Sequence, residues 1–214
     1  MSDHTGQALC NNHLVSGTAR GVVGFVFSVA LLAACSFPGS VKPTVKVGLS
    51  APFEGLHRDL GYEVLYAVRL AVRQRNAMGG VGERYLVEFV ALNDFGEAEA
   101  AVEQARKMAV DPGVLGVLGG LSPEAARAAA PEYARQGLAF LMPEISVIES
   151  EQSLPHETSF SSEYEGLSGG VPPGPAAAWA YSEANRLLDA LDAAIQTDGM
   201  PTRFGVRKAL VATP

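Results

Sequence analysis

Residues 114–143 constrain the fold more than any other stretch of the chain. They begin with a continuous apolar run, 114–120, that ends in two glycines. Ser122 and Pro123 then open an alanine-rich segment, and 139–142 form a second short apolar run. An apolar run that does not alternate with polar residues is typical of a strand covered on both faces, as in a parallel sheet. The stretch therefore predicts a strand, a tight turn, a helix and a second strand.

The start of this helix carries clear sequence signals. The Ser122 hydroxyl can accept hydrogen bonds from free N–H groups of the first turn, and Pro123 fits the first helical position. Glu124 complements the positive end of the helix, and Pro131 predicts a kink partway along it. Ligands of open α/β sheets bind at the loops that follow the carboxyl ends of the strands. A ligand site is therefore expected at that edge of the sheet.

Strands and helices alternate through residues 45–143. Apolar runs predict strands at 45–49 and 85–92, and apolar residues three and four apart predict helices at 60–78 and 97–110. The inward positions are Val64, Leu65, Val68, Ala71 and Val72 in the first helix and Ala98, Ala101, Val102, Ala105 and Met108 in the second. This alternation requires parallel strands joined by right-handed crossovers. We therefore predict a three-layer α/β fold, a parallel four-stranded sheet with helices on both faces.

The pattern changes after residue 143. Residues 144–175 are rich in Ser, Glu, Gly and Pro, which predicts a flexible linker in which only 145–148 could form a strand. A helix is expected at 176–197, and a second helix at 203–212 has Thr202 as its N-cap.

The amino-terminal 34 residues have the pattern of a signal peptide. About 13 apolar or small residues follow Arg20, which matches a signal peptide and is too short for a spanning helix. Leu-Ala-Ala-Cys35 resembles a bacterial lipobox, in which the cysteine becomes the lipidated first residue of the mature protein. The alternatives are an ordinary signal peptide or an anchor helix. Residues 35–44 then form a Pro/Gly/Ser-rich tether to a membrane.

Composition excludes several classes of function. The chain is 48% hydrophobic and 18% charged, which is typical of a globular protein, and its formal charge of −7 argues against a nucleic-acid partner. The letters Gly-x-Ser-x-Gly at 166–170 lack the strand and helix that a nucleophile elbow needs. His57 and His156 lack the spacing of metal ligands, so we expect neither a metal nor a cofactor and no enzymatic activity.

Several segments resemble a known family. They are 45–55 (VKVGLSAPFEG), 67–80, 93–94, 118–122, 128–136 and 141–146. Together they resemble the type I periplasmic binding proteins, and most closely the branched-chain amino acid receptors that supply ABC transporters. Residues 176–212 resemble a late segment of the same family, and 144–175 stand where the family has most of a second lobe. The resemblance therefore implies a single lobe made of 45–143 and 176–212.

The resemblance also implies which residues bind the ligand. Family members hold the α-carboxylate and α-amino groups with loops after strands three and four. Those positions here include Leu121, Ser122, Ile145 and Ser146; Phe53, Glu54 and Asp94 lie in the loops after strands one and two. Helix capping is the alternative role for Ser122 and Asp94, and packing against the core is the alternative role for Phe53. Glu144 and Glu54 depart from the small polar residues that the family usually has at these positions.

Two functions are compatible with these features. The first is a lipid-anchored, extracytoplasmic, truncated solute-binding protein that captures a small amino-acid-like or amide solute for an ABC permease. A second lobe supplied in trans would be its further partner. The second is a binding-incompetent remnant of such a receptor, or a protein-interaction module derived from one. Two-lobed relatives close over their ligand and exclude water, so a single lobe is expected to bind more weakly.

Overall fold

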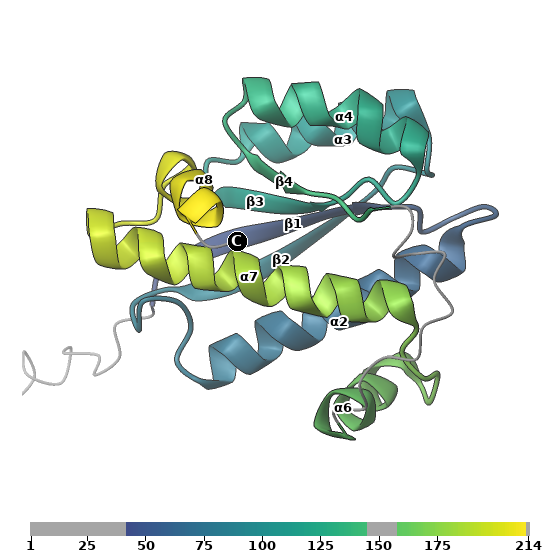
Figure 1. Ribbon diagram of the computed structural model, residues 1–214, viewed down its shortest axis with the longest axis horizontal. Helices are drawn as coiled ribbons and strands as arrows, with labels where there is room; N and C mark the ends of the chain where they lie inside the picture. Colours follow the sequence, from purple (N-terminus) through teal and green to yellow (C-terminus); the bar gives the residue numbers. More distant parts are fainter. Residues whose placement is uncertain (1–41, 145–157, 213–214) are drawn as a thin grey trace, which may run out of the picture. The chain divides into compact units, whose positions relative to one another are not determined.

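Four parallel strands form the centre of the protein. The computed structural model describes residues 42–144 and 158–212. Its strands are β1 (Thr44–Ala51), β2 (Leu86–Asn93), β3 (Val114–Gly119) and β4 (Ala139–Leu141). They form one sheet in the order β2-β1-β3-β4, and each neighbouring pair is parallel (Figure 1). The predicted parallel four-stranded sheet is therefore confirmed.

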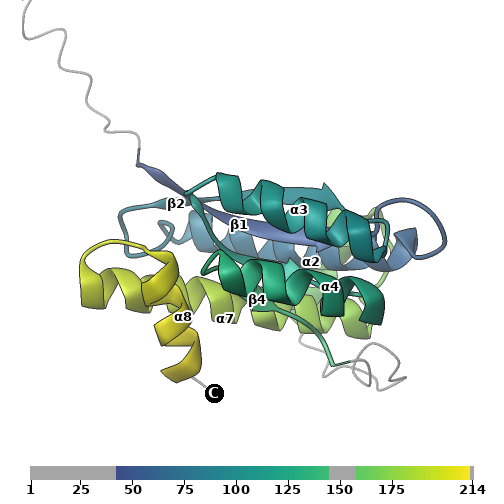
Figure 2. The same cartoon turned by 90° about the horizontal axis from the view of Figure 1, so that it is seen from above.

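Helices cover both faces of this sheet. The two views place α3 (Ala98–Val110) and α4 (Pro123–Arg135) on one face and α2 (Arg58–Ala77) and α7 (Pro175–Asp198) on the other (Figures 1 and 2). The short α6 (Thr158–Ser168) packs on α2, and α8 (Arg203–Ala212) packs on α7. The predicted three layers follow from this arrangement.

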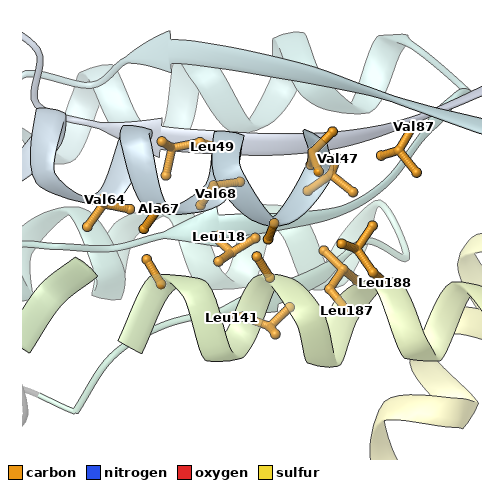
Figure 3. Close-up of a cluster of buried hydrophobic side chains, with 14 of the residues drawn as sticks. Val47, Leu49, Val64, Ala67, Val68, Val87, Leu118, Leu141, Leu187 and Leu188 are labelled. Atoms are coloured by element: carbon orange, nitrogen blue, oxygen red, sulfur yellow. The ribbon is translucent and has the colours of Figure 1, made fainter. Parts of the chain in front are cut away.

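The larger part of the core lies between the sheet, α2 and α7. Figure 3 shows valines and leucines from the sheet and from these two helices meeting side by side. The close packing depends on Gly116 of β3, because a Cβ atom there would lie 2.5 Å from Cδ1 of Leu187. On the other face, Met108, Val117 and Tyr133 belong to a second buried cluster under α3 and α4. The continuous apolar run of β3 is thus buried from both sides, as its sequence predicts.

Most predicted elements are confirmed within a few residues of their predicted ends. Ser122 is the N-cap of α4 and accepts a hydrogen bond from the N–H of Ala125 at 3.1 Å. Thr202 accepts one from the N–H of Gly205 at 3.0 Å. Ala98 is an exception, because it is exposed at the start of α3 although the pattern predicts an inward position. The first residue of a helix has no preceding turn to hold it against the sheet.

The prediction of an unstructured linker is wrong for residues 158–168, which form α6. Phe160 and Tyr164 lie one helical turn apart and are both buried. The Tyr164 hydroxyl donates to the carbonyl of Glu63 on α2 at 3.1 Å, so two aromatic side chains anchor an otherwise polar helix. Residues 145–157, which include the possible strand at 145–148 and His156, lie outside the described residues.

Within residues 42–144 and 158–212, no helix has both the length and the apolar character needed to cross a bilayer.

Candidate functional site

A cavity of about 630 Å³ lies at the carboxyl edge of the sheet. Because all four strands are parallel, the loops that follow them share this edge. The cavity is lined by Pro52, His57, Leu60, Gly120, Leu121, Ser122, Pro123, Glu124, Ala126, Arg127, Met142 and Pro143. These residues come from the loops after β1, β3 and β4 and from the beginnings of α2 and α4. The cavity is therefore located at the edge where a parallel sheet is expected to hold a ligand.

Ser122 lies in the cavity wall at the amino terminus of α4. Its hydroxyl donates to the carbonyl of Gly96 at 2.7 Å while accepting from the N–H of Ala125. The hydroxyl therefore already has a donor and an acceptor within the protein. The positive end of the α4 dipole remains directed toward the cavity and favours a negatively charged group there.

Arg127 brings a positive charge to the same wall. Its Nε donates to the carbonyl of Pro123 at 3.1 Å, and its Nη2 lies 3.4 Å from Oε1 of Glu124. The side chain is largely exposed, so the ion pair with Glu124 is weak and open to exchange with a ligand. Arg127 was not among the residues predicted from the sequence. The helical spacing from Pro123 could have found it, because residues four apart lie on the same face.

Asp94 supports the site from beneath rather than lining it. Its side chain is buried, and its two carboxylate oxygens accept from the Ser50 hydroxyl at 2.8 Å and from the Gly96 N–H at 2.9 Å. Gly96 in turn accepts the hydrogen bond of Ser122. These contacts connect β1, the loop after β2 and the cap of α4. Asp94 is thus connected to Ser122 through Gly96 and does not itself line the cavity.

Burial raises the pKa of Asp94, and the hydrogen bonds from Gly96 and Ser50 oppose this rise. The folded protein therefore keeps a proton on Asp94 over a range above the ordinary aspartate pKa, where the unfolded chain has lost it. The contribution of Asp94 to the free energy of unfolding then falls as the pH rises through that range.

We expect the Asp94→Asn variant to gain stability relative to the wild type as the pH rises, because asparagine does not titrate. Urea unfolding of both proteins between about pH 4 and about pH 7 measures this difference. The wild type minus variant free energy of unfolding should decline with rising pH. A difference that is constant with pH would contradict the proton assigned to buried Asp94.

The other predicted site residues are placed as follows. Phe53 is half-buried, packs against the core with its ring 5.7 Å from that of Tyr62, and does not line the cavity. Glu54 is exposed and does not line it either. Leu121 and Ser122 do line it, whereas Ile145 and Ser146 lie outside the described residues. Among residues 42–144 and 158–212, no three His, Cys, Asp or Glu side chains are grouped to hold a metal ion.

Known proteins share both the sequence pattern and the fold. A sequence profile described as "Periplasmic binding protein" matches residues 44–162. The chain belongs to the periplasmic binding protein family. Its members are non-catalytic solute-binding proteins, which agrees with the absence of enzymatic activity expected from the sequence. None of the curated protein sequences compared with this chain matches it significantly.

Solved structures show the same fold. A structure described as a branched-chain amino acid ABC transporter from Rhodospirillum rubrum has a TM-score of 0.66 and 18% identity, with 79% of this chain and 89% of that chain covered. The substrate-binding protein LivJ from Streptococcus pneumoniae in complex with isoleucine has a TM-score of 0.67 and 12% identity, with 79% and 88% covered. An ABC transporter solute-binding protein from R. palustris in complex with benzoate has a TM-score of 0.60 and 12% identity, with 79% and 86% covered.

Proposed function

We propose that this protein captures a small solute for an ABC uptake system, and that the solute binds in the cavity at the carboxyl edge of the sheet. The cavity is the single observation that carries the proposal. Its volume of about 630 Å³ lies within the range of small-molecule sites. Membership of the periplasmic binding protein family supports the same function.

The lining of the cavity favours an amphipathic solute that carries a carboxylate. Leu60, Leu121 and Met142 supply an apolar wall. The amino terminus of α4 and the Arg127 guanidinium supply positive charge, and Glu124 in the same lining is paired with Arg127. A small amino acid with a branched aliphatic side chain has this combination of groups, whereas its amide keeps the apolar side chain but lacks the carboxylate. Two proteins of the same fold are described as branched-chain amino acid transport proteins, which supports this class.

We infer an extracytoplasmic location with a lipid anchor. Residues 1–34 would be removed as a signal peptide, Cys35 would carry the lipid, and residues 35–44 would tether the domain. The lipobox-like Leu-Ala-Ala-Cys35 is the support for this inference. A mass increase at Cys35 equal to the lipid, in protein purified from bacterial membranes, tests it.

We further infer that the chain is a single lobe composed of 45–143 and 176–212. Residues 144–175 replace the second lobe, and α6 occupies part of them. A ligand on one lobe remains partly solvated, which weakens every polar contact. We therefore expect a dissociation constant on the order of 1 mM for the lobe alone. A second lobe supplied in trans, or docking on the ABC permease, would strengthen binding.

Calorimetry of the full chain against leucine, isoleucine, valine and their amides tests the proposal. We expect saturable heat with at least one of them, and about fivefold weaker binding of the free acid after Arg127→Ala, because one exposed charge contact is lost. Arg69→Ala, on the exposed side of α2, is the matched control and should leave the heat unchanged. Absence of heat throughout the panel at millimolar solute would contradict capture and favour a remnant or an interaction module.

A further inference from the structure

The outward face of α8 combines apolar and basic side chains. Phe204 and Val211 are 75% and 87% exposed, and Arg207 and Lys208 are exposed between them. These four positions follow the spacing i, i+3, i+4, i+7, so they lie on one face of the helix. The opposite face carries Val206, which is fully buried. The outward face therefore has large apolar groups that the fold itself does not cover.

The charge of this face differs from that of the chain as a whole. The protein has a formal charge of −7, yet residues 199–212 contain three basic residues and no Asp or Glu. Arg203 points inward and donates to backbone carbonyls, which leaves Arg207 and Lys208 as the outward cations. Glu183 and Arg207 line a groove beside β4, and Glu183 is paired with Arg186 at 2.9 Å. The face is thus locally cationic on an anionic protein.

Helix α8 begins at the amino edge of the sheet, opposite the cavity, and from there Arg207 and Val211 lie beside β4. Arg203, at the start of α8, donates to the carbonyls of Asp111 and Val114, which precede and begin β3. The beginning of β1 lies at the same end of the sheet in both views (Figures 1 and 2). The described chain starts there at Lys42, seven positions after Cys35. Seven extended residues span about 25 Å at most, so a lipid on Cys35 would hold this edge near the bilayer.

We propose that the outward face of α8 binds the surface of an anionic membrane, so that the amino edge of the sheet faces the lipid and the cavity faces away from it. This inference rests on the lipid anchor of the proposed function and is independent of the solute. Aromatic and aliphatic side chains enter the interfacial layer, while neighbouring cations meet anionic headgroups. A short helix with two outward cations binds weakly alone, and the tether raises its effective concentration at the surface.

The test uses two single-cysteine variants of the lipidated, processed protein. Each variant carries one fluorescent label. After processing, Cys35 carries the lipid and Cys10 is absent, so an introduced cysteine is the only one to react. Val211→Cys reports the α8 face, and Glu54→Cys reports the opposite edge near the cavity. Each labelled protein is inserted into vesicles of phosphatidylcholine alone, or of equal parts phosphatidylcholine and phosphatidylglycerol, that contain a quencher at headgroup depth.

We expect the label at position 211 to be quenched in the anionic vesicles and not in the neutral ones, and the label at position 54 to stay unquenched in both. Lys208→Glu should reduce the fraction of label at position 211 that is quenched at least about fivefold, and high salt should do the same. Arg69→Glu makes the same charge change elsewhere and should have no effect. An unquenched label at position 211 in anionic vesicles would overturn the proposal and leave an acidic protein as the partner of this face.

The outcomes of the two proposals can be separated. Mass spectrometry shows whether Cys35 carries a lipid before any vesicle is added, and calorimetry reports solute binding without a membrane. If the lipid is absent, the Val211→Cys chain, with Cys10 and Cys35 replaced by serine, is mixed with the same vesicles. Quenching in the anionic vesicles alone would still support binding of the α8 face to an anionic membrane. Absence of quenching would overturn that proposal.

Discussion

Replacing Gly61 with alanine should lower the free energy of unfolding by about 3 kcal/mol, the upper end of the usual cost of overpacking. Gly61 lies buried in the first turns of α2, directly against the loop after β1. A Cβ atom there would lie 1.8 Å from the carbonyl oxygen of Pro52 and 2.7 Å from its carbonyl carbon. Helix propensity alone predicts the opposite sign, a gain of about 1 kcal/mol. The steric contact dominates because backbone must move to relieve it.

The same substitution should also disturb the cavity. Pro52 lines it, as do His57 and Leu60 from the segment that would have to shift. Urea unfolding measures the change in the free energy of unfolding. Titration with the solute measures the change in the affinity of the cavity.

Gly166→Ala is the matched control, because Gly166 is an exposed position in α6 where a Cβ atom would meet nothing within 4 Å. It should raise the free energy of unfolding by about 0.5–1 kcal/mol. If both substitutions changed the free energy of unfolding equally, helix propensity would govern both, and the contact between position 61 and Pro52 would not be tight.

Arg203→Ala should cost about 3 kcal/mol, because it leaves several backbone carbonyls without their charged donor. The guanidinium donates to the carbonyls of Ala109, Asp111 and Val114 at 3.0, 2.7 and 3.0 Å, and more loosely to Gln136 at 3.4 Å. It thus joins α8 to the ends of α3 and α4 and to the start of β3. Urea unfolding of the variant measures the loss.

Two further variants separate this role from charge and from helix propensity. Arg207→Ala removes an exposed arginine from the same helix and should change stability by less than about 0.5 kcal/mol. Arg203→Lys keeps the charge but lacks the planar set of donors, so it should recover only part of the loss. Full recovery by lysine would show that charge alone holds α8 in place.

The layered fold could be predicted because its signals are local. β3 is buried at every position, and its unbroken apolar run is typical of a strand with a helix layer on each side. The buried faces of α2 and α7 recur at three- and four-residue steps. Ser122 and Pro123 mark the beginning of α4 within the sequence itself. Each of these features needs only neighbouring residues to be recognised.

Helix α6 could not be predicted in the same way, because its stability comes from partners distant in sequence. Phe160 packs 4.6 Å from the ring of Tyr181, and Tyr164 packs 6.2 Å from that of Tyr66. Its own residues are mostly small and polar, so composition indicated a linker. Tertiary burial of two rings overrides that local preference.

The candidate site was predicted in location but only partly in residues. Topology places the strand ends at one edge, which is why Leu121 and Ser122 line the cavity. It does not determine which way a loop side chain points, and Asp94 turns inward to Ser50 and Gly96. Arg127 was missed because it reaches the cavity from the second turn of a helix rather than from a loop.

The two helices that cover one face of the sheet come from opposite ends of the described chain. Val64 and Val68 of α2 share a single core with Leu187 and Leu188 of α7 (Figure 3). During synthesis the part of that face under α7 therefore stays uncovered until residues 175–198 have been made. Such late, non-local closure delays folding. The core under α2 and α7 must therefore wait for α7, however early the sheet and α2 are made.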